Sequence, residues 1–151
     1  MSRTLPEARQ AFLAAMQRDT PGTDLPRYVA VLDALLAWSA ERADRLTFRA
    51  GETRADVIRF ARAGTKEVLW SAQLARGGAP KLEIHLPAGR PMSAEDRATA
   101  MATLNAHSRE VLEEGDRLRI GFGALKNAAA LAAVLAMMTG LVEDSGRPAG
   151  R

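Results

Sequence analysis

The sequence contains no cysteine among its 151 residues. Disulfides, thiolate metal sites, iron–sulfur clusters and a cysteine nucleophile are therefore excluded, because each of them needs a thiol. A chain without cysteine also suits a reducing compartment, and its first ten residues lack the apolar stretch of a secretory signal. We expect a cytoplasmic, soluble protein that has no contact with a membrane.

Histidines and enzyme signatures are also scarce. The chain has only two histidines, whereas a metal centre takes three or four converging ligands. G-x-S-x-G, the Walker loop, G-x-G-x-x-G and H-E-x-x-H do not occur. We therefore predict no catalytic residues, no metal and no cofactor, and we lean towards a protein that is not an enzyme. A metal held only by carboxylates, with Glu113, Glu114 and Asp116 as the densest acidic run, stays an open alternative.

The chain has little excess charge of either sign. Its formal net charge is +3, and Arg3, Arg147 and Arg151 lie near the two ends. The remainder is formally neutral, which gives little support to a polyanionic partner.

Two segments at the start of the chain have helical periodicity. Apolar residues recur at helical spacing from Leu5 to Arg18, and a wide apolar stripe that includes Trp38 runs on to about Ala43. We expect Asp24 to cap the second helix, with Pro26 in its first turn.

Beyond Leu46 the hydrophobic period changes from about 3.6 to 2, which predicts strands over 46–50, 56–62, 67–74 and 81–86. Glycine-containing turns between them favour antiparallel hairpins. Alternation places the following apolar residues on the core face: Leu46, Phe48, Ile58, Phe60, Val68, Trp70, Leu82, Ile84 and Leu86.

The last third returns to helix with one strand inside it. We predict a helix from Ser93 to about Leu112, a turn over 113–116, a fifth strand over 117–122 and a last helix ending near Val142. The fold class is then α+β, a two-layer sandwich with helices on one face of a largely antiparallel five-stranded sheet (order α-α-β-β-β-β-α-β-α). We expect a single domain over 1–143 and a flexible tail over 144–151. The order of elements resembles that of small frataxin-like domains in topology alone, which implies nothing about function.

Basic side chains gather on the outward face of the predicted sheet. With one acidic residue among them, they are Arg49, Arg59, Lys81, Glu83, His85, Arg117 and Arg119. Such a face favours nucleic-acid binding as one alternative, although it lacks the exposed aromatics on which bases stack. A second alternative is a small enzyme or an anion carrier that uses Glu83 and His85.

The last helix carries no charged residue between Lys126 and Glu143. A helix that is apolar on nearly every side is buried in its own domain or against another copy. Our leading hypothesis is therefore a non-enzymatic binding or assembly module that forms a homodimer through Leu131, Leu135 and Met138. We interpret the glycines at 121 and 123, with Lys126 nearby, as a tight turn in preference to a phosphate site.

Overall fold

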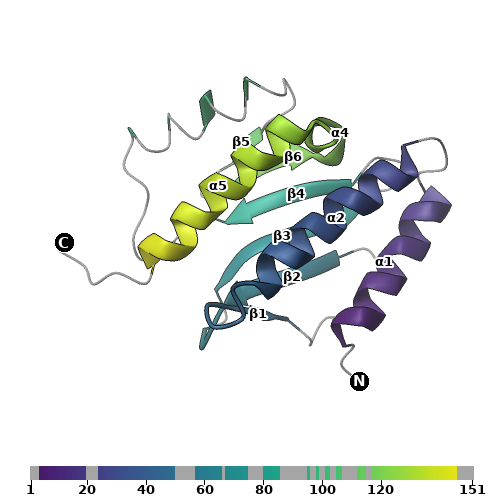
Figure 1. Ribbon diagram of the computed structural model, residues 1–151, viewed down its shortest axis with the longest axis horizontal. Coiled ribbons are helices and arrows are strands. Elements are labelled where there is room, and N and C mark those ends of the chain that lie inside the picture. The colour runs from purple at the N-terminus through teal and green to yellow at the C-terminus, as the bar shows by residue number, and fades with distance from the viewer. Residues whose placement is uncertain are drawn as a thin grey trace.

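The protein has an α+β architecture in which helices cover one face of an antiparallel sheet (Figure 1), as the sequence predicts. The computed structural model describes residues 4–19, 24–49, 57–65, 67–74, 80–85, 95, 98, 101–102, 105–106, 112–114 and 117–145. The helices are α1 (Leu5–Asp19), α2 (Leu25–Ala40), α4 (Phe122–Leu125) and α5 (Ala128–Ser145). The strands are β1 (Leu46–Phe48), β2 (Val57–Arg62), β3 (Val68–Leu74), β4 (Pro80–His85), β5 (Leu112–Glu114) and β6 (Arg117–Gly121).

The sheet has six strands in the order β1-β2-β3-β4-β6-β5, and every neighbouring pair is antiparallel. The strand that sequence reasoning missed is β5, since we expected Leu112 to end a helix and residues 113–116 to form a turn. Its three residues pair with β6, so the segment forms a short hairpin at one edge of the sheet. Three residues are too few for alternation to reveal a strand.

Of the helix predicted over 93–112, residues 95, 98, 101, 102 and 105 are described as helical. The rest of that segment lies outside the described residues, apart from Ala106, which is in a turn, and Leu112 in β5.

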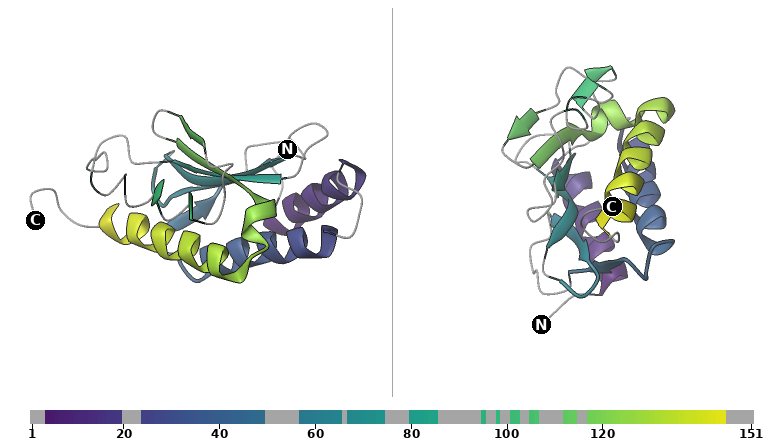
Figure 2. Two further views of the ribbon diagram at one scale, coloured as in Figure 1. Left: turned by 90° about the horizontal axis from the view of Figure 1, so that it is seen from above. Right: turned by 90° about the vertical axis from the view of Figure 1, so that its left-hand side faces the viewer.

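All three long helices lie on the same side of the sheet, as the two views of Figure 2 show. Across the middle of that side, Phe60, Trp70, Ile84 and Leu118 are Cα partners on successive strands. Each of these four residues is at most 4% exposed. The row joins Phe12 of α1 in one hydrophobic cluster, which is the core of the molecule.

A β-bulge shifts the alternation in β3. Ala61 pairs with Val68 and Phe60 pairs with Trp70, which leaves Leu69 as an extra residue between them. Leu69 is completely buried and belongs to the core, whereas Val68 is half-buried. Our assignment of Val68 to the core face is therefore wrong, because strict alternation holds only until a strand gains a residue.

The starts of α2 and α5 are capped differently. Asn127 Oδ1 accepts hydrogen bonds from the backbone N–H groups of Ala129, at 2.9 Å, and Ala130, at 3.1 Å. Asp24 occupies the N-cap position of α2 but makes no side-chain cap hydrogen bond. Its Oδ2 instead lies 3.2 Å from Nζ of Lys126, the residue that follows α4. An ion pair therefore takes the place of the expected cap.

The last helix is longer than predicted, since α5 continues to Ser145 and includes residues 144 and 145 of the expected tail. Residues 146–151 lie outside the described part of the chain. Among the described helices, none combines the length and the apolar character that crossing a membrane demands.

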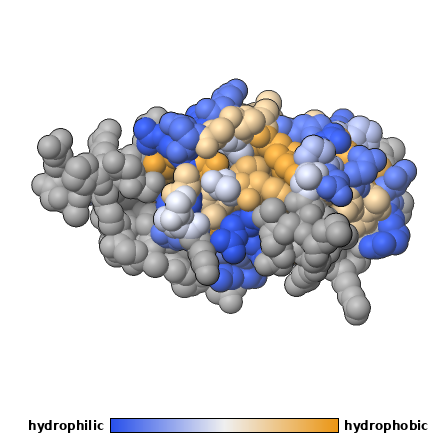
Figure 3. Space-filling model, turned by 90° about the horizontal axis from the view of Figure 1, so that it is seen from below, coloured by the Kyte–Doolittle hydropathy of each residue, from blue (hydrophilic) through white to orange (hydrophobic). Residues whose placement is uncertain are grey.

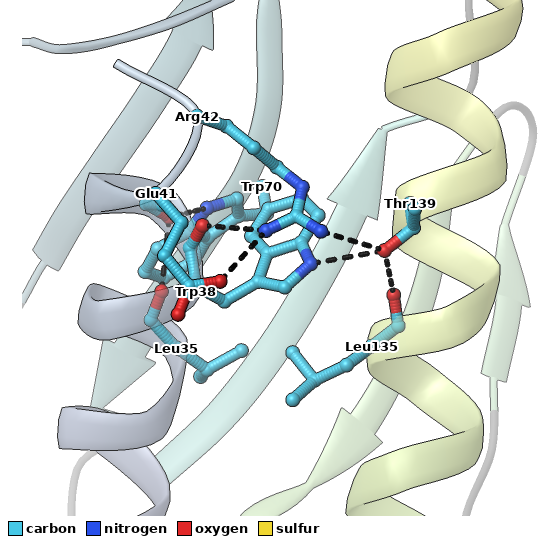
Figure 4. A network of polar contacts seen from close by, with 8 residues as sticks. Leu35, Trp38, Glu41, Arg42, Trp70, Leu135 and Thr139 are labelled. Atoms are coloured by element: carbon cyan, nitrogen blue, oxygen red, sulfur yellow. Dashed lines mark hydrogen bonds and ion pairs between the residues drawn. The ribbon is translucent and has the colours of Figure 1, made fainter.

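Both tryptophans bury their rings in the core and keep a partner for their N–H groups (Figure 4). Nε1 of Trp70 donates to Oγ of Ser39 at 3.0 Å, and Nε1 of Trp38 donates to Oγ1 of Thr139 at 3.0 Å. Arg42 lies over the Trp38 ring, 4.5 Å from its centroid. These contacts tie α2 to β3 and α5, because a buried N–H without a partner is costly.

The edge strand β1 lies on the side from which Figure 3 views the molecule. Hydrophobic residues occupy the middle of this side, with hydrophilic residues around them (Figure 3). Phe48 of β1 is half-buried, and its ring packs 5.9 Å from that of Phe60. A strand of only three residues limits pairing with another chain at this edge.

Candidate functional site: a buried glutamate among cationic side chains

Four polar side chains of β4 and β6 come together on the face of the sheet opposite the three long helices. We call Glu83, His85, Arg117 and Arg119 the Glu83 cluster. The antiparallel register pairs Glu83 with Arg119 and His85 with Arg117. Cα partners in a sheet project to the same face, and residues two apart on one strand share that face. The alternation of β4, with Ile84 in the core, therefore puts all four side chains on the other side.

The carboxylate of Glu83 is the centre of this cluster. Its Oε2 accepts a hydrogen bond from Nε of Arg119 at 2.6 Å, and its Oε1 accepts one from Nη1 of Arg117 at 3.4 Å. Nε2 of His85 lies 3.0 Å from the same Oε1, a contact that gains charge only when the imidazole is protonated. Three nitrogen groups thus converge on one carboxylate.

Burial is graded across the Glu83 cluster. The Glu83 side chain is 3% exposed, while the side chains of His85, Arg119 and Arg117 are 20%, 34% and 49% exposed. A buried carboxylate is tolerated when charged partners and hydrogen bonds replace its water, and the two arginines meet this need. Glu83 is therefore nearly inaccessible, and its partners form the accessible rim of the cluster.

The cluster continues one strand further into the sheet. Ser71 of β3 is the Cα partner of Glu83, is completely buried, and accepts a hydrogen bond from Nε2 of Gln73 at 3.1 Å. Arg59 of β2 is in turn the partner of Ser71 and is half-buried. A polar row therefore crosses four strands, parallel to the apolar row on the helical face.

The structure does not gather all of the predicted basic residues. Lys81 is exposed and pairs with Gln73 and Gly121, four residues from His85 along the same face of β4. Arg49 follows the end of β1, where its backbone N–H donates to the carbonyl of Arg59 at 3.0 Å. Contacts within hydrogen-bond or ion-pair distance join Glu83 to His85, Arg117 and Arg119.

The structure gives less support to two other candidate sites, an anion site near Lys126 and a metal site made of carboxylates. Lys126 pairs with Asp24 and lies 5.9 Å from the Tyr28 ring centroid, so its charge is engaged beside the glycines at 121 and 123. Within the described residues, no three histidine or carboxylate side chains are placed to hold a metal ion. The side chains of the acidic run at 113–116 lie outside the description.

Sequence reasoning missed one polar residue of interest, Arg62 at the end of β2. Its side chain is 10% exposed, and Nη1 lies 3.4 Å from Oε1 of Glu67. Burial lowers the pKa of the Arg62 guanidinium from its ordinary value, an effect that Glu67 opposes. The signal was present in the strand pattern, because Ile58, Phe60 and Arg62 share one phase and the first two lie in the core.

Comparisons with known proteins return no relative for this chain. No protein-family model matches it, and neither the curated proteins nor the solved structures give a significant match. The topological resemblance to frataxin-like domains is thus without support, and a functional argument has to come from the residues themselves.

Proposed function

We propose that this protein is a non-enzymatic binding module that holds a small oxyanionic ligand at the Glu83 cluster. The observation that carries this proposal is the convergence of Arg117, Arg119 and His85 on a single buried carboxylate. Two guanidinium groups and an imidazole around one buried carboxylate put several hydrogen-bond donors at a partly exposed rim. An oxyanion is the ligand that such a rim recognises.

Arg117 is the residue best placed to meet the ligand. Its side chain is 49% exposed, and its contact with Glu83 uses Nη1 alone at 3.4 Å. Nε and Nη2 form the opposite edge of the guanidinium, and within the described residues they have no hydrogen-bond partner. That edge matches the two oxygens of a phosphate or carboxylate group.

The role of Glu83 supports binding in preference to catalysis. Both of its oxygens already contact cationic or imidazole nitrogens, which suits a group that holds neighbouring side chains in place. A general base needs an oxygen within reach of a substrate proton. At 3% exposure the Glu83 carboxylate is shielded from a ligand at the rim.

Titration of the purified protein with inorganic phosphate, followed by calorimetry, tests the proposal. We expect saturable binding that weakens at least about tenfold in Arg117→Gln, because a hydrogen bond to a charged group contributes about 1.5–3 kcal/mol. Arg45→Gln is the matched control, since the Arg45 side chain is 46% exposed and lies outside the cluster. Equal phosphate affinities in the two variants, or no binding by the wild type, would refute the site.

The same titration separates this proposal from nucleic-acid binding. A single oxyanion neutralises few charges, so its affinity should depend weakly on salt, whereas a strand that contacts many phosphates releases many counterions. Tight binding of an oligonucleotide with a steep salt dependence would favour the nucleic-acid alternative.

Self-association through α5 is the second candidate function. Ala129, Ala132 and Ala136 are exposed, and Leu131 and Leu135 are partly buried beside them. No charge interrupts this outer side before Glu143, so two copies meet there without like-charge repulsion. Met138, which we expected to take part, is completely buried in its own chain and is excluded from such a contact.

Sedimentation velocity tests the second candidate. A dimer in the wild type that becomes a monomer in Ala136→Glu would support it, because the carboxylate would then lie unpaired in the interface. A wild-type monomer at micromolar concentration would remove this candidate and leave the anion site untouched.

A further inference from the structure

Arg62 carries a buried pair of hydrogen-bond donors on the helix-covered side of the sheet. It is the last residue of β2, and its Cα partner in β1 is Leu46, which is 4% exposed and part of the core. The Arg62 residue as a whole is 8% exposed. A guanidinium has therefore been placed at the border of the hydrophobic cluster, away from the Glu83 cluster on the opposite face.

The hydrogen-bonding groups of Arg62 are only partly used. Its backbone N–H donates to the carbonyl of Glu67 at 2.9 Å, and its carbonyl accepts from the backbone N–H and Oγ1 of Thr65. In the side chain, Nη1 has Glu67 as its partner. Nε and Nη2 are both buried and have no hydrogen-bond partner in the described part of the chain.

These two nitrogens are the edge with which an arginine binds a carboxylate in a bidentate manner. Arg9 shows this in the same molecule, since its Nε donates to Oδ1 of Asp33 at 2.8 Å and its Nη2 donates to Oδ2 at 3.0 Å. Arg62 therefore presents, in a buried position, the same edge that Arg9 uses to bind Asp33. Buried donors of a charged group are normally satisfied, because leaving them without a partner is unfavourable.

We propose that the Nε and Nη2 edge of Arg62 is a binding site for a small carboxylate. Two parallel N–H groups match the spacing and the plane of the two carboxylate oxygens. Glu67, whose side chain is 39% exposed, reaches Nη1 at 3.4 Å and already supplies one negative charge, so a carboxylate with a single charge fits better than a dianion. A dianion would bring an excess of negative charge into this border of the core.

Acetate is the probe for this site. The Nε–H signal of Arg62 in an NMR spectrum of the wild-type protein should move in a saturable way as acetate is added. The Nε–H signal of Arg9 is an internal control, because Asp33 already occupies its edge. A shift no larger than the one that chloride causes at the same ionic strength would overturn the proposal. Exchange of the Arg62 Nε–H with water that acetate does not slow would also overturn it.

Two variants separate a binding role from a structural one. Arg62→Lys keeps the charge but lacks the two-pronged edge, so acetate should raise the thermal midpoint of the wild type and leave that of the variant unchanged relative to chloride. Glu67→Gln removes the competing anion on Nη1 and should strengthen the acetate response. If both variants respond to acetate as the wild type does, Arg62 does not bind the carboxylate. These experiments leave Arg117 intact, so their failure is distinguishable from failure of the phosphate site.

Discussion

The two faces of the central sheet are made by alternate residues of the same strands, yet they use opposite means of stabilisation. On the helical face, Trp70 stacks on Phe60 with ring centroids 5.1 Å apart and excludes water. On the other face, the next residue, Ser71, is equally buried but is polar and is the Cα partner of Glu83. One side gains from apolar area, and the other depends on every polar group having a partner.

The difference shows where function can reside. The helical face is filled by its own side chains, whereas the polar face ends in Arg117 and Arg119, whose guanidinium groups reach solvent. Arg62 is an exception to this division, because it is a charged residue on the apolar face. Substitutions on each face should reveal the two modes of stabilisation.

The largest effect is expected for Trp70→Ala. The side chain is completely buried, stacks on Phe60 and donates to Ser39. Its removal leaves a cavity and takes away the donor to Oγ of Ser39, which keeps its hydrogen bond to the carbonyl of Leu35, so the free energy of unfolding should fall by about 3–5 kcal/mol. Urea denaturation measures this loss. A loss smaller than that of the polar-face variant below would contradict the assignment of the core to the helical face.

Next in size is Leu69→Ala, which tests the bulge in β3. Leu69 is completely buried, so truncation should cost about 2–5 kcal/mol of unfolding free energy. Val68→Ala is the matched control and should cost clearly less, because Val68 is half-buried. The reverse order in urea denaturation would mean that strict alternation holds and that the bulge is absent.

A smaller effect is expected for Glu83→Gln on the polar face. The amide cannot balance Arg117 and Arg119, so the free energy of unfolding should fall by about 1–3 kcal/mol, with solvent around the half-exposed arginines limiting the loss. Glu41→Gln is the control, because Glu41 is 75% exposed and lies 3.5 Å from Arg42. If the free energy of unfolding falls by the same amount in the two variants, the Glu83 carboxylate does not stabilise Arg117 and Arg119.

The fold was largely predictable, because hydrophobic period separates helix from strand over segments longer than about five residues. That rule placed α1, α2, α5 and five of the six described strands within a few residues of their bounds. It failed where a segment is short, as in β5, and where a strand gains a residue, as at Leu69. The prediction that Asp24 caps α2 failed for another reason, because Lys126, which is distant in sequence, forms an ion pair with its carboxylate.

The candidate site was predictable in its members and not in its arrangement. Alternation put Glu83, His85, Arg117 and Arg119 on one face, because a side chain's face follows from its parity along the strand. Pairing of β4 with β6 depends on a register between segments more than thirty residues apart along the chain, which no local pattern contains. For the same reason the burial of Glu83 could not be foreseen.

By itself, the sequence determined which elements form and which residues line each face, because helical and strand periods are local properties of the chain. The tertiary structure alone decided that β6 lies beside β4 and that Glu83 is enclosed by two arginines. It also decided that Met138 is buried in its own chain and that Arg62 lies at the border of the core. Contacts of this kind depend on which distant surfaces meet, and packing sets that for the whole molecule at once.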